Sequence, residues 1–148
     1  MKHLILIFPV LAIAGCTSPA LQAPGAAPAP TLNATPPPPT TATTVEQFDT
    51  TSEAERAAAA AAETGGADAP LGVTVASLGP PTEPGIWLKT PLVDVLTEGR
   101  ITFAGKSINV ELRPSGGAAG AGSQISLAAM RLLDAPLTGL PEITVFAK

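Results

Sequence analysis

The sequence predicts a small, mostly β domain with one short helix, preceded by a long N-terminal extension. Residues 71–76 alternate in character, as expected of a half-buried strand. Two further strand-like runs, 99–103 and 107–112, flank a short Ala-Gly-Lys segment, which is typical of a β-hairpin. The chain ends with Ile-Thr-Val-Phe at 143–146, another strand pattern. Together these observations place the folded domain at residues 71–148.

The first fifteen residues have the pattern of a secretory signal peptide. A short positive start is followed by an apolar run at 4–13, too short to span a bilayer, and by small residues just before Cys16. The sequence Ile-Ala-Gly-Cys at 13–16 resembles the lipobox of bacterial lipoproteins. The resemblance implies cleavage before Cys16, acyl chains such as palmitate on that residue, and attachment to a membrane. Because Thr17 rather than an aspartate follows, it also implies the outer membrane. The alternative is an ordinary signal peptide with a chance cysteine.

Cleavage at this point would limit the chemistry of the mature chain. It removes His3, the only histidine, and uses Cys16, the only cysteine, as the attachment point of the acyl chains. Tyrosine is absent throughout. A Ser-His-Asp triad, a Cys-His pair, an internal disulfide and a zinc site of the usual His/Cys type are then excluded. We therefore expect no metal and no cofactor. Carboxylates, hydroxyls and lysines remain as candidates for catalysis.

Residues 16–49 read as a lipid-anchored linker rich in proline, threonine and alanine. Prolines in residues 17–44 remove backbone donors and favour an extended polyproline II conformation, and few side chains here could form a core, so we expect a disordered linker. The segment is either a spacer that lifts the domain off the membrane or a low-complexity leader. The acidic residues before position 71 and the formally neutral remainder leave no basic patch, so we expect no nucleic-acid partner.

An alanine-rich helix is predicted at residues 50–65. Ser52 with Glu55 forms a capping box, and Thr50 with Glu53 offers a second register. Six consecutive alanines follow, and two glycines end the run. Because the helix lacks a large apolar stripe, we expect it to be solvated at the edge of the domain rather than to self-associate through its alanines.

The remaining elements of the domain are short. Residues 86–89 form an apolar strand limited by a following proline, and 114–122 form a loop of glycine, alanine and serine. Ser126 can cap a short helix that ends near residue 134. The inward face of that helix should comprise Leu127, Met130 and Leu133.

The segment 122–146 resembles the second half of the double-psi β-barrel of rare lipoprotein A. The likeness lies in a strand ending in a hydroxyl residue, a short Ala/Leu helix, a glycine turn and an alternating strand, and it extends over about 86–147. It implies a double-psi barrel that contacts peptidoglycan. Catalytic members of that family cut glycan strands with an aspartate and a nearby histidine. The mature chain has no histidine, and Glu111-Leu112-Arg113-Pro114 stands where the Asp-Arg-Gly-Pro turn would lie, so we expect the activity to be absent.

The whole chain also resembles short bacterial lipoproteins that sometimes carry the label D-galactarate dehydratase. The shared segments are 50–56 and 85–92. Dehydration of an aldarate needs a base for the proton beside the carboxylate and an acid for the leaving hydroxyl. No metal cluster can be assembled from histidine or cysteine, so the chemistry does not favour this label.

Several side chains are candidates for ligand binding. They are Trp87, Lys89, Asp94, Glu111 and Arg113. Trp87 could stack on a sugar ring or pack inside the domain. Asp94 with Glu98 could form an acid-base pair for sugar chemistry, or both could be solvated surface.

Two classes of function therefore compete. The favoured one is a non-enzymatic lipoprotein of the cell envelope, on the periplasmic side of the outer membrane, whose β domain binds peptidoglycan or another envelope protein. The other is an enzyme, either a carboxylate-based glycan-cleaving protein or a lyase like D-galactarate dehydratase. The absence of an imidazole and a thiol from the mature chain favours the first.

Overall fold

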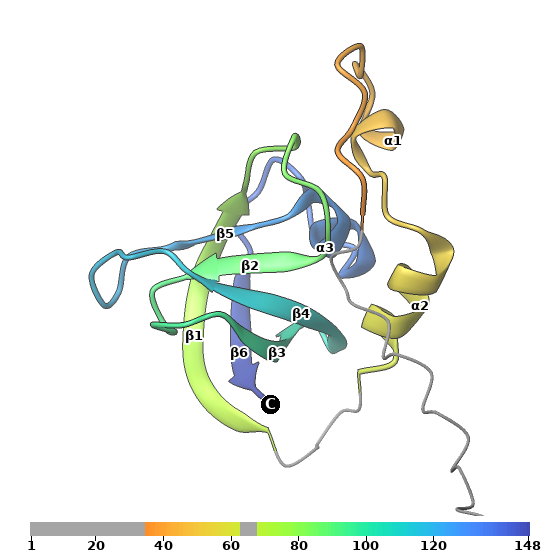
Figure 1. Ribbon diagram of the computed structural model, residues 1–148. Helices are drawn as coiled ribbons and strands as arrows, with labels where there is room; N and C mark the ends of the chain where they lie inside the picture. The colour runs from red at the N-terminus through yellow and green to blue at the C-terminus, as the bar shows by residue number, and fades with distance from the viewer. Residues whose placement is uncertain (1–34, 63–67) are drawn as a thin grey trace, which may run out of the picture.

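The computed structural model describes residues 35–62 and 68–148 (Figure 1). The predicted signal peptide, Cys16 and the first part of the predicted linker lie outside these residues. The regular secondary structure is mostly β, as predicted. The elements in chain order are α1 (Val45–Phe48), α2 (Glu53–Ala60), β1 (Ala69–Leu78), β2 (Trp87–Thr90), β3 (Thr97–Phe103), β4 (Lys106–Pro114), β5 (Ser123–Ile125), α3 (Leu127–Leu132) and β6 (Glu142–Ala147).

The six strands close into one barrel in the order β1-β5-β2-β4-β3-β6. Two neighbouring pairs, β1 with β5 and β2 with β4, are parallel, and the others are antiparallel. Alternate residues of each strand point into the barrel, and they supply most of the buried apolar side chains. The opposite faces of the strands are therefore available for a site.

The predicted hairpin is confirmed as β3 and β4. Their pairing runs from Thr97 opposite Leu112 to Phe103 opposite Lys106. The two linking residues, Ala104 and Gly105, have φ values of 47° and 83°. Two positive φ values in a two-residue turn match the right-handed twist of the flanking strands, which explains the tight connection.

The short helix α3 also agrees with its prediction. The Ser126 side chain accepts a hydrogen bond from the backbone N–H of Ala129, which caps the first turn. The predicted inward residues Leu127, Met130 and Leu133 are buried. The helix therefore closes over the barrel core through the face that its apolar spacing indicates.

The described part of the predicted linker contains a short helix and contacts the rest of the protein. Residues 45–48 form α1, and Thr44 and Gln47 make a capping box at its start. The Thr35 hydroxyl donates to Glu55 Oε1 at 2.5 Å, and Arg131 of α3 holds Asp49 Oδ2 at 2.6 Å. Residues 45–48 of the predicted linker are thus helical, and polar side chains fasten its C-terminal part to α2 and α3.

The helix α2 lies at the edge of the domain with much of its surface exposed, as expected, and its capping box is confirmed, but one face packs on the barrel. Ser52 and Glu55 exchange the two predicted hydrogen bonds, and the helix lies beside β4 in Figure 1. Ala59 is fully buried in the core cluster, and Asn109 Nδ2 donates to the carbonyl of Ala58 at 3.2 Å. Small alanine side chains let the helix backbone approach the strand closely, so no large apolar stripe is needed.

Glu55 joins the N-terminal segment to α2. Burial acts to raise its pKa, but hydrogen bonds from Thr35 and Ser52 and the charge of Arg56 outweigh burial, so the pKa lies below its ordinary value. The ionised carboxylate is therefore the form that holds this segment in place.

No helix within residues 35–62 and 68–148 is long and apolar enough to cross a membrane.

Candidate functional site

The parallel pairing of β2 with β4 brings four of the predicted site residues together. Trp87 lies opposite Glu111, and Lys89 lies opposite Arg113. Leu88 and Leu112, between them, are fully buried in the core. Because side chains alternate along a strand, the four candidates share the opposite face of the sheet.

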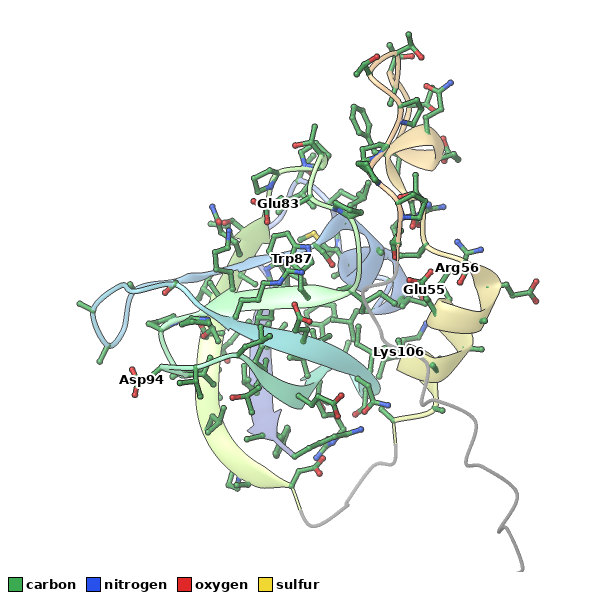
Figure 2. The ribbon with its side chains drawn as sticks, viewed as in Figure 1. Glu55, Arg56, Glu83, Trp87, Asp94 and Lys106 are labelled. Carbon is green, nitrogen blue, oxygen red and sulfur yellow. The ribbon has the colours of Figure 1, made fainter. Side chains whose placement is uncertain are left out.

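Trp87 lies at the centre of this group but is fully buried (Figure 2). Its indole N–H donates to the carbonyl of Glu83 at 3.4 Å, and a Cβ added to Gly79 would stand 2.5 Å from its ring. The Lys89 ammonium and the Arg113 guanidinium lie 5.3 and 5.1 Å from the ring centroid. Protein side chains thus occupy the ring faces, which favours the packing role of Trp87 over stacking on a sugar.

The cations above Trp87 belong to a network with two carboxylates. Arg113 Nε donates to Glu111 Oε1 at 2.6 Å, while an Arg113 terminal nitrogen lies 3.7 Å from Glu83 Oε2. Lys89 Nζ is 3.5 Å from both oxygens of Glu83. The Lys89–Glu83 contact is the looser interaction, because it is long and both side chains are partly exposed.

Glu83 is the residue of this network that sequence reasoning missed. It lies in the connection between β1 and β2, where the pattern Glu-Pro-Gly indicates only a turn. Its position over Trp87 depends on how this connection folds back across the barrel. The only sequence feature that could have pointed to Glu83 is its place four residues before the only tryptophan and directly before a proline, and this signal is weak.

A groove of about 580 Å³ opens beside Lys89, between the outer face of β1, β5 and β2 and the loop at 115–122. In Figure 1 this loop projects away from the barrel between β4 and β5. The lining residues combine hydroxyl and amide groups with one cation and two exposed apolar side chains. They include Ser77, Lys89, Ser115, Gln124, Val75 and Leu140.

Strand register aligns the polar floor of the groove. Ser77 of β1 lies opposite Gln124 of β5, which in turn lies opposite Lys89 of β2. Neighbouring strands are about 4.8 Å apart, so a hydroxyl, an amide and an ammonium form a row roughly 10 Å long. Such a row can donate hydrogen bonds to a polar ligand and neutralise one negative charge.

Asp94 does not join this site. It is exposed in the connection between β2 and β3 and lies well away from Trp87 and Glu83 in Figure 2. Glu98 is also exposed, and its cross-strand neighbour is Glu111, whose carboxylate is already paired with Arg113. The structure therefore brings Trp87, Lys89, Glu111 and Arg113 together but leaves the Asp94–Glu98 pair as surface carboxylates.

The acidic residues do not form a ligand set for a metal either. Within residues 35–62 and 68–148, no three Asp, Glu, His or Cys side chains gather closely enough to hold an ion. The site is instead a mixed row of polar groups beside a balanced set of ion pairs. Binding through hydrogen bonds and charge is the chemistry that this arrangement provides.

No protein-family model, curated protein or solved structure is significantly similar to this chain. The resemblances to rare lipoprotein A and to the lipoproteins labelled D-galactarate dehydratase therefore remain predictions from the residues that suggest them.

Proposed function

We propose that this protein is a lipid-anchored lipoprotein of the outer membrane whose barrel faces the periplasm and binds peptidoglycan without cleaving it. The anchoring part of the proposal rests on the lipobox-like sequence ending in Cys16. The binding part rests on the groove beside Lys89, and that groove is the single observation that carries it. Its row of hydroxyl, amide and ammonium groups suits a polar polymer that carries carboxylates.

The placement of the carboxylates favours binding over catalysis. Glycan cleavage by two carboxylates needs both to flank one scissile bond, at separations of about 5 to 9.5 Å. Asp94 lies away from the groove, and Glu111 is engaged by Arg113. The two carboxylates therefore do not flank a common position in the groove.

We further propose that the barrel is of the double-psi type, as the resemblance to rare lipoprotein A implies. The closed six-stranded barrel and its two parallel strand pairs support this assignment. Peptidoglycan is the ligand that the resemblance suggests. Another envelope protein is the alternative partner, and the experiment below separates the two.

The test is co-sedimentation of the full-length protein, purified in detergent, with insoluble peptidoglycan sacculi. The supernatant is assayed for released muropeptides. Retention on the sacculi without release supports the proposal. Release that is lost in Glu111→Gln or Asp94→Asn would identify an enzyme and overturn it. An absence of both retention and release would also overturn it and would point to a protein partner.

A further inference from the structure

We infer that the groove beside Lys89 takes a short peptide ending in a free carboxylate, with the Lys89 ammonium as its counter-ion. The inference rests on the proposed binding of peptidoglycan and narrows it to the stem peptides rather than the sugar strands. Four features of the groove support this inference. They are a lysine that can exchange one carboxylate partner for another, an edge of β1 without a partner strand, the absence of an aromatic side chain, and small apolar side chains.

Lys89 can leave Glu83 for a ligand in the groove without leaving any carboxylate of the network unpaired. Its contact with Glu83 is long, at 3.5 Å, and about a third of each side chain is exposed. If Lys89 turned into the groove, Glu83 would keep Arg113 at 3.7 Å, and Arg113 would keep Glu111 at 2.6 Å. Turning therefore breaks one long, partly exposed ion pair and the contact of the ammonium with the Trp87 ring, and it leaves both carboxylates paired with Arg113. A carboxylate in the groove would replace that pair with a charge-assisted hydrogen bond.

Within the described residues, the edge of β1 beside the groove lacks a partner strand before Ala76. β5 pairs with β1 only at Ala76–Leu78, so on this side residues 73–75 have no partner strand. Val75 lines the groove, and residues 73–75 line a smaller adjoining hollow that is bounded by Leu92 and the 120–122 segment. An unpaired strand edge offers N–H and C=O groups at the spacing of an extended peptide.

The lining of the groove suits small side chains and not sugar rings. No aromatic residue lines it, and the only tryptophan of the chain is fully buried. Sugar rings usually bind against an exposed aromatic face, whereas methyl groups pack on aliphatic side chains. Val75 and Leu140, which are 44% and 69% exposed, provide such contacts at the groove. The combination fits an alanine-like peptide better than a glycan strand.

The test uses acetyl-D-alanyl-D-alanine as the free acid and as its C-terminal amide, titrated into the full-length protein by NMR. The side-chain amide of Gln124 reports on the groove, and the indole N–H of Trp87 reports on the Lys89–Glu83 network. The acid should shift both signals in a saturable way, and the amide should bind about tenfold more weakly, as expected when one charge-assisted contact is lost. Equal binding of acid and amide, or no binding, would overturn the inference.

Three variants locate the contact. Lys89→Gln should weaken binding of the acid about tenfold, while Lys89→Arg should retain most of it. Lys106→Gln is the matched control, because Lys106 is exposed at the turn of the β3–β4 hairpin and lies apart from Trp87 in Figure 2. Trp87 fluorescence checks that each variant is folded. Equal affinities of Lys89→Gln and the control would contradict the assignment.

The two proposals can fail separately. If the acid binds at Lys89 but sacculi do not retain the protein, the groove is assigned correctly and peptidoglycan is the wrong partner. If sacculi retain the protein as well after their stem peptides have been removed enzymatically, the proposed function stands and the inference about the peptide is wrong.

Discussion

The hydroxyl of Ser126 links β2 of the candidate site to α3, so its removal should lower the free energy of unfolding. The side chain is fully buried and accepts hydrogen bonds from the backbone N–H groups of Ala129, at 3.3 Å, and Trp87, at 3.1 Å. In Ser126→Ala the loss of the cap costs about 1 kcal/mol. The unsatisfied, buried N–H of Trp87 adds about 1–3 kcal/mol. We therefore expect the free energy of unfolding to fall by roughly 2–4 kcal/mol.

The assay is urea unfolding followed by the fluorescence of Trp87, the only tryptophan of the chain. Ser52→Ala is the matched control. Ser52 caps α2 through one comparable bond, to the N–H of Glu55 at 3.2 Å, but it is exposed. Water can satisfy the freed group there, so the loss should be about 0.5–1 kcal/mol. If Ser126→Ala costs no more than Ser52→Ala, the claim that this hydroxyl ties β2 to α3 is refuted.

Three further predictions concern packing and charge. Gly99→Ala should destabilise the barrel by at least about 1–3 kcal/mol, because its Cβ would stand 2.4 Å from Leu112 Cδ1 and 2.5 Å from a backbone oxygen of β6. Thermal unfolding checks this, with Gly117→Ala in the exposed loop as a control that should change little. Emission from Trp87 should be blue-shifted and poorly quenched by acrylamide, since the ring is buried; strong quenching would contradict its placement. Because the pKa of Glu55 is lowered in the folded state, its stabilising effect should be present at neutral pH and be lost as the pH falls through and below the ordinary glutamate range. NMR signals of residues 35–62 should report this loss, and Glu55→Gln should weaken their pH dependence; an unchanged dependence would assign the effect to another group.

The elements that could be predicted from the sequence are those determined by local chemistry. The hairpin follows from two linking residues flanked by alternating runs, and α3 follows from Ser126 and its apolar spacing. Even α1, which was missed, carries a local signal, because Thr44 and Gln47 have capping-box spacing. β5 cannot be predicted from its own pattern, because three residues are too few to show a period; only the resemblance to rare lipoprotein A implies a strand there.

The features that could not be predicted depend on contacts between distant parts of the chain. Asp49 meets Arg131 across 82 positions, and Asn109 meets Ala58 across 51. The sequence of residues 35–62 has no periodicity that predicts contacts with Arg131 or Asn109. Its composition alone therefore suggests a solvated segment. The candidate site was likewise only partly predictable from the sequence. Alternation predicts which face of its own strand each of Lys89 and Arg113 occupies, but only the parallel register of β2 with β4 makes the two residues neighbours.

The most direct test of the central claim is photo-crosslinking in intact cells from Ser115, which is exposed at the rim of the groove. A photo-reactive amino acid replaces Ser115 in the full-length protein, and a second version carries it at the exposed Ala104 in the hairpin turn. The account predicts crosslinks from position 115 to material that muramidase digestion releases, and few such crosslinks from position 104. A discrete protein adduct at position 115, or equal labelling of peptidoglycan from both positions, would contradict it.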